Sequence, residues 1–142
     1  MPAGSNGIAL QFAGRLDIQI RLEMAGMNEE DRRAKRKQVS ERIDVRDEML
    51  DAVIGLIGNV SETGMLLLSN RAMADDALFQ LRFTVTDTAG NQRELSVGAH
   101  QLWSETANSP GQYWTGFRFI DVGSDDLTVL RIWIDQPGSH YV

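Results

Sequence analysis

The sequence predicts a mainly β fold with one helix near its end, and two observations support that prediction. Apolar and polar residues alternate along several segments, most clearly over residues 79–86, as they do in strands that bury one face. Later the pattern changes to helical spacing, with an apolar face formed by Leu127, Leu130, Trp133 and Ile134. The chain of 142 residues is 42% hydrophobic and 24% charged, which is typical of one globular domain.

The beginning of the chain is expected to contain a strand of its own. Residues 16–22 alternate apolar and polar side chains over their whole length. This strand could lie at the edge of the domain, belong to a variable extension, or pair with a second copy of the chain. The last arrangement would make a homodimer, because an apolar strand without a partner favours self-association.

A short helix is expected next, capped by Asn28. Acidic residues fill its predicted first turn, and Lys35, Arg36 and Lys37 fill its last turn. This distribution complements a helix dipole, so a solvated helical turn that binds nothing is one interpretation of these cations.

From residue 40 onward the chain reads mostly as strands. A turn is expected at residues 88–91 and a surface loop at residues 104–112. Ser124 is the expected N-cap of the helix, with Asp125 and Asp126 in its first turn. The predicted strands cover residues 43–45, 49–57, 65–68, 79–86, 95–103 and 113–120.

Two short stretches stand out as candidate binding segments. Five cations occupy the six positions of residues 32–37, in a chain whose formal net charge is -6, and such a local exception indicates an anion. Residues 59–64 interrupt an apolar segment with small polar side chains. In an extended backbone Asn59 and Ser61, two positions apart, would lie on one face of the sheet.

These stretches carry a family resemblance. Arg32 and Arg36 match an R-x-x-x-R signature, and Asn59, Ser61 and Gly64 match the [D/N]-x-S-x-x-G signature that follows it in PilZ domains, the bacterial receptors for cyclic di-GMP. Either motif alone is weak, whereas their order and spacing together are specific.

The resemblance extends over roughly residues 29 to 135, and a late G-x-R-F pattern at residues 116–119 supports it. It implies a small six-stranded antiparallel Greek-key β-barrel with a C-terminal α-helix. We therefore divide the chain into an N-terminal extension, residues 1–28, and a PilZ domain, residues 29–142.

The resemblance also implies a function. The domain would be a cyclic di-GMP receptor that changes shape and regulates a downstream protein partner, with residues 28–39 becoming ordered across the barrel when ligand binds. The alternative is a PilZ-like adaptor that acts by protein contact, for example in type IV pilus assembly, without binding nucleotide. Those members generally lack one or both signatures, so the receptor is favoured.

The implied roles follow the chemistry of the ligand. Arginine can meet the O6 and N7 edge of guanine with two parallel hydrogen bonds, stack on the base, or pair with phosphate. Position 59 is Asn where the family more often has Asp, and position 63 is Thr where a second glycine is frequent. The residues expected to bind cyclic di-GMP are Arg32, Arg33, Arg36, Asn59, Ser61, Gly64 and Trp103.

Two of the late residues have structural alternatives. Trp103 lies where some family members place a residue beside the purine, so it either stacks on the base or packs in the core or at the barrel rim. Arg118, within the late motif, is assigned a structural role.

Other classes of function lack support in the sequence. No nucleophile elbow or P-loop occurs, so no catalytic residues are predicted. No cofactor or metal is expected, because the chain has no cysteine and His100 and His140 lie forty residues apart. The acidic balance argues against DNA or RNA. No apolar run is long enough for a membrane span and no signal peptide is evident, which indicates a cytoplasmic protein.

Overall fold

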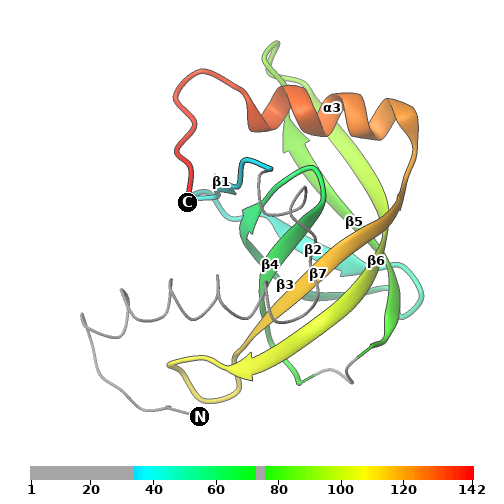
Figure 1. Ribbon diagram of the computed structural model, residues 1–142, viewed down its shortest axis with the longest axis vertical. Helices are drawn as coiled ribbons and strands as arrows, with labels where there is room; N and C mark the ends of the chain where they lie inside the picture. The colour runs from blue at the N-terminus through cyan, green and yellow to red at the C-terminus, as the bar shows by residue number, and fades with distance from the viewer. Residues whose placement is uncertain (1–33, 73–75) are drawn as a thin grey trace.

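The computed structural model describes residues 34–72 and 76–142, and these form seven strands and one helix (Figure 1). The predicted strand at residues 16–22 lies outside the described residues. The elements are β1 (Lys37–Gln38), β2 (Asp44–Asp47), β3 (Ala52–Val60), β4 (Gly64–Ser69), β5 (Leu78–Thr86), β6 (Gln92–Thr106), β7 (Tyr113–Val122) and α3 (Ser124–Ile134).

Six of the strands close into an antiparallel barrel. The strand order is β3-β2-β5-β6-β7-β4, and β4 pairs back with β3, so the sheet has no free edge inside this ring. Strands β5, β6 and β7 are consecutive neighbours, and β4 lies beside β7. The connection from β4 to β5 is therefore the long Greek-key connection. The predicted six-stranded barrel with a C-terminal helix is confirmed, and β1 is added to it along β3.

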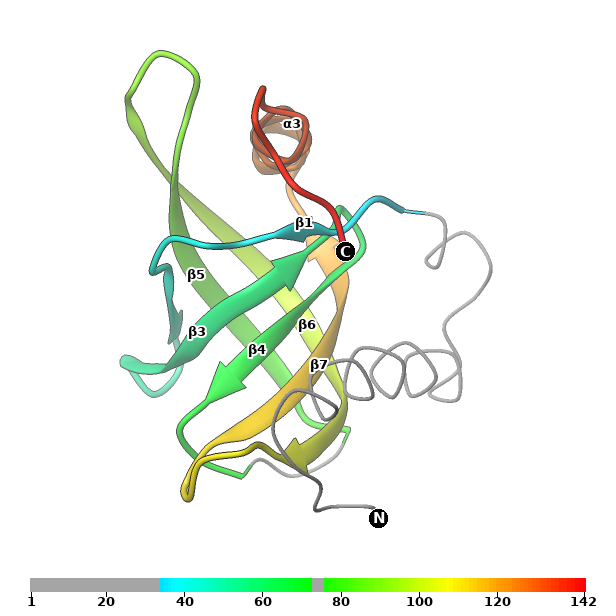
Figure 2. The ribbon, with the colours of Figure 1, turned by 90° about the vertical axis from the view of Figure 1, so that its left-hand side faces the viewer.

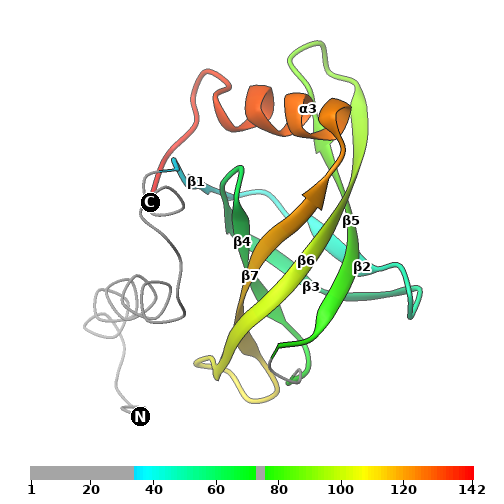
Figure 3. The ribbon, with the colours of Figure 1, turned by 45° about the vertical axis from the view of Figure 1, so that its right-hand side comes forward.

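The barrel interior is a single apolar core, and α3 covers one end of it (Figures 1 and 3). Alternate residues of β5 point inward, including Leu81, Phe83 and Val85, as the period of two predicted. The helix buries Leu130, Trp133 and Ile134. Within the described ranges no helix has the length and apolarity needed to cross a membrane.

Several element boundaries differ from the prediction, and β6 continues to Thr106, three residues into the loop expected at residues 104–112. The strand expected to start at residue 49 begins at Ala52, because residues 48–51 form a turn in which the Asp47 carboxylate accepts the backbone N–H groups of Met49 and Leu50. The helix N-cap is Gly123 rather than Ser124, and no side chain caps it. Helical hydrogen bonding starts one residue earlier than expected, with Leu127 N–H donating to the Gly123 carbonyl.

The helical last turn expected at residues 35–37 is also wrong. Lys37 begins strand β1, in which Lys37 and Gln38 pair with Val60 and Asn59 at the end of β3. Pairing with a distant strand satisfies the backbone groups that a helix would otherwise have satisfied. This strand brings the end of the basic run to residues 59–64, and Figure 2 shows β1 lying across the ends of β3 and β4.

Candidate functional site

The candidate site begins with Arg36, the last residue before β1. Because β1 pairs antiparallel with β3, the Arg36 side chain lies against the end of β3. Its Nε donates to Asn59 Oδ1 at 2.8 Å, and its Nη1 makes a longer contact of 3.4 Å with Ser61 Oγ. One guanidinium thus contacts both polar side chains of residues 59–64. Asn59 and Ser61 therefore face the same side of the barrel, as their spacing predicted.

The turn from β3 to β4 is held by hydrogen bonds within residues 59–64. Ser61 N–H donates to the Gly64 carbonyl at 2.8 Å, and Ser61 Oγ accepts Thr63 N–H at 3.1 Å. Phe119 of β7 donates its N–H to the Thr63 carbonyl, which fixes the turn to the barrel. Ser61 is fully buried and Asn59 is 8% exposed, so both side chains are held in place before any ligand contact is considered.

Gly64 is required by the neighbouring strand. Its φ is not positive, unlike that of three other glycines and two aspartates among the described residues. A Cβ atom at position 64 would lie under 3.0 Å from the carbonyl oxygen of Phe117 on β7, closer than real Cβ atoms come to backbone. The glycine therefore allows β4 and β7 to approach where the polar turn ends, and a role in ligand approach stays a prediction.

The two lysines beside Arg36 turn away from it and toward α3. Lys37 is 7% exposed, and its Nζ donates to the Trp133 carbonyl at 2.9 Å and lies 4.2 Å from the centroid of the Trp133 ring. Burial lowers the pKa of Lys37, because the charged form loses its hydration. Sequence reasoning missed this contact. No local pattern could have found it, because β1, whose extended backbone puts Arg36 on one face and Lys35 and Lys37 on the other, is only two residues long.

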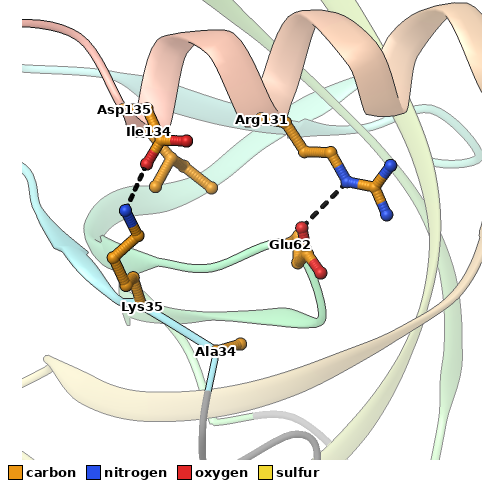
Figure 4. A pocket seen from close by; sticks show the side chains of 6 residues that line it. All are labelled: Ala34, Lys35, Glu62, Arg131, Ile134 and Asp135. Atoms are coloured by element: carbon orange, nitrogen blue, oxygen red, sulfur yellow. Dashed lines mark hydrogen bonds and ion pairs between the residues drawn. The ribbon is translucent and has the colours of Figure 1, made fainter.

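A small cavity lies between the basic segment, the polar turn and α3 (Figure 4). Its volume is about 210 Å³. Two exposed ion pairs border it: Arg131 Nε to Glu62 Oε2 at 2.9 Å, and Lys35 Nζ to Asp135 Oδ1 at 2.7 Å. The hydrogen bond to Asp135 raises the pKa of Lys35. The helix is thus paired with both candidate binding segments, through contacts that are individually weak because they are exposed.

Trp103 lies in the same cross-strand row as Asn59, but two strands, β4 and β7, separate the two residues. Strand register places Asn59 opposite Leu66, Leu66 opposite Gly116, and Gly116 opposite Trp103. A Cβ at position 116 would lie 2.5 Å from Trp103 Nε1, so the indole covers the space that this glycine leaves. Trp103 is 8% exposed and packs with Leu66. These contacts favour the packing alternative over stacking on a base.

The structure therefore brings together Arg36, Asn59 and Ser61, with Gly64 at the end of the same turn. Arg32 and Arg33 lie outside the described residues, so their predicted roles have no structural test. In Arg36, this arrangement offers a cation with parallel N–H donors. Beside it lie an amide and a hydroxyl, which can each donate and accept hydrogen bonds. Such a set suits a ligand that combines anionic charge with hydrogen-bonding edges.

Comparison with known proteins decides the family. A family model described as the PilZ domain matches residues 30–136, well over half of the chain. The chain belongs to the PilZ domain family. The matched residues include both signatures and all of the strands and the helix described above, so this PilZ domain accounts for the whole barrel. No curated protein matches the sequence.

Two solved structures share the fold of this PilZ domain. The Bacillus subtilis inhibitor of motility, MotI/DgrA, matches with a TM-score of 0.58 and 12% identity, covering 70% of this chain and 46% of that chain. This chain therefore spans less than half the length of the Bacillus protein. The PilZ domain of YcgR from Escherichia coli, solved with c-di-GMP, matches with a TM-score of 0.51 and 14% identity, covering 72% of this chain and 88% of that chain.

Proposed function

We propose that this PilZ domain is a cyclic di-GMP receptor. The observation that carries the proposal is the contact of Arg36, from the first signature, with Asn59 and Ser61, from the second. Arg36 is more than twenty positions before Asn59 and Ser61 in the chain. The backbone pairing of β1 and of the turn does not require an arginine at position 36. The family match and the solved YcgR domain with c-di-GMP support the same ligand.

The ligand chemistry fits the groups that converge. Cyclic di-GMP has two phosphates and two guanines, and the O6 and N7 atoms of a guanine are adjacent acceptors. Arg36 supplies parallel donors for that edge or a charge for phosphate, which lysine could not match with two bonds. Asn59 supplies an amide whose oxygen can accept from the N–H groups of guanine, and Ser61 supplies a buried hydroxyl that already contacts Arg36. Ligand binding would exchange contacts within the protein for contacts to the base.

The proposed change of shape centres on the basic segment. Lys37 and Gln38 are already paired with β3 and keep Arg36 at the end of that strand, so ligand binding would rearrange the residues before Arg36 rather than fold the whole of residues 28–39. The rearranged surface would then present itself to a downstream protein. This is a switch between two arrangements of one segment on a fixed barrel.

Isothermal titration with cyclic di-GMP tests the proposal. Wild type should bind, and GTP and cyclic di-AMP should bind far more weakly. Arg36→Ala should lose about 1 to 3 kcal/mol of binding free energy, the usual contribution of a bidentate contact between arginine and guanine. Arg36→Lys should also bind weakly, because it keeps the charge without the planar fork.

Arg42→Ala is the matched control. Arg42 is exposed, pairs with Asp44 and belongs to neither signature, so its removal should leave the affinity unchanged. A thermal melt of each variant separates lost binding from lost folding. If wild type gives no heat at high micromolar ligand, the receptor proposal is wrong and the adaptor alternative takes its place.

A further inference from the structure

Strand β1 is bonded along both of its edges, and only one of its partners belongs to the barrel. On one edge it pairs with the end of β3. On the other it meets residues 139–142: Gln38 N–H donates to the His140 carbonyl at 2.8 Å, and Val142 N–H donates to the Arg36 carbonyl at 2.9 Å. A bridge between Lys37 and Tyr141 lies between these two bonds. Figures 1 and 2 both show the end of the chain beside β1.

Residues 139–142 are also anchored to α3, apart from their pairing with β1. Tyr141 donates its hydroxyl to the Ile134 carbonyl at 2.8 Å. The Tyr141 ring lies 5.4 Å from Lys35 Nζ, and Lys35 pairs in turn with Asp135. Side chains and backbone therefore hold these residues against the segment that carries Arg36.

From this geometry we infer that residues 139–142 are a positioning element of the ligand site. The identity of the ligand rests on the proposed function, whereas the positioning of Arg36 by residues 139–142 does not. A strand of two residues paired on one edge has few hydrogen bonds to hold it, and the second edge adds the bond at the Arg36 carbonyl itself. Residues 139–142 thereby hold the Arg36 backbone so that its side chain points at Asn59 and Ser61.

Thermodynamic linkage gives the inference a second consequence. If residues 139–142 favour the arrangement of Arg36 that binds ligand, ligand must favour the docking of residues 139–142 by the same factor. Occupancy of the site would then be reported in this segment, which hydrogen-bonds to the Arg36 carbonyl. Val142 is 55% exposed, so a partner protein could contact the segment without entering the ligand site.

Val142→Pro compared with Val142→Ala isolates the backbone contact. Proline removes the N–H that donates to the Arg36 carbonyl, and its fixed φ suits an extended segment. Alanine removes the exposed side chain and keeps the N–H. Deletion of residues 139–142 serves as a second variant, and thermal melts check that the barrel stays folded.

The first readout needs no ligand. In nuclear magnetic resonance spectra the Nε–H signal of Arg36 should be protected from solvent exchange in wild type and Val142→Ala, because it donates to Asn59. Val142→Pro and the deletion should lose much of that protection. Equal protection in all four proteins would overturn the inference.

The second readout is affinity for cyclic di-GMP. Val142→Pro should bind roughly 2- to 12-fold more weakly than wild type, the range expected for one lost hydrogen bond. Val142→Ala should bind as wild type does, and saturating ligand should slow exchange of the Gln38 amide in wild type. If wild type fails to bind, the proposed function is wrong, and the Nε–H readout still decides whether residues 139–142 position Arg36. Wild-type affinity in Val142→Pro would overturn the inference and leave the receptor proposal intact.

Discussion

Replacing Gly64 by alanine separates two explanations for this signature residue. A Cβ at position 64 would lie under 3.0 Å from the Phe117 carbonyl oxygen and 3.4 Å from the Arg118 Cα. The obstacle is backbone, so β4 or β7 has to shift, and each strand is paired on both edges of a closed barrel. Overpacking of this kind costs about 1 to 3 kcal/mol. For a domain of this size that corresponds to a melting temperature lower by about 3 to 12 °C.

The assay is thermal and urea unfolding of Gly64→Ala beside Gly123→Ala. No atom lies within 4 Å of a Cβ built on Gly123, which has negative φ, so the control should lose less than about 1 kcal/mol, the change expected at an N-cap. Gly64→Ala should be destabilised whether or not cyclic di-GMP is present. A variant as stable as wild type that fails to bind ligand would refute the packing explanation and assign the glycine to ligand approach.

Three further predictions concern single side chains. Asn59→Asp should bind cyclic di-GMP up to about tenfold more tightly by titration, because a carboxylate accepts charge-assisted bonds from guanine N–H groups; weaker binding would count against the assigned role. The lowered pKa of Lys37 means that the unfolded state binds more protons, so stability relative to Lys37→Met should rise as pH increases from the lowered pKa toward 10.5. Urea unfolding at pH 7 and pH 10 measures this, and a difference that falls with pH would contradict it. Trp103→Ala should lower the unfolding free energy by about 3 to 5 kcal/mol, as expected for a buried tryptophan. Loss of a stacked base would instead reduce the binding free energy by about 1 to 3 kcal/mol. A larger effect on affinity than on stability would instead assign Trp103 to the ligand.

Local patterns were sufficient to predict most of the barrel and the helix. The alternation in β5 and β6 and the helical spacing of Leu130, Trp133 and Ile134 each report a face that is buried whatever its partner is. Strand β1 has no such signal, because it is two residues long and forms only through pairing with β3 and residues 139–142. Its charges fit a helix dipole equally well, and the long-range pairing overrode that local preference.

The candidate site divides in the same way. The i, i+2 spacing predicted that Asn59 and Ser61 share a face, and Arg36 contacts both. The burial of Lys37 on Trp133 could not be predicted, because a lysine in a basic run gives no sign of a carbonyl acceptor nearly a hundred residues later. The distance of Trp103 from Asn59 likewise depends on the register of four strands, which a single sequence leaves open.

Amide chemical-shift mapping during titration with cyclic di-GMP tests the central claim most directly, because it reports both binding and its place. We expect saturable shifts at residues 36–38 and 59–64, where Arg36 meets Asn59 and Ser61. The turns at residues 48–51 and 88–91 should stay unchanged, since neither contains a residue of the candidate site. Saturable shifts confined to another surface, or none at high micromolar ligand, would contradict the claim that the two signatures form one cyclic di-GMP site.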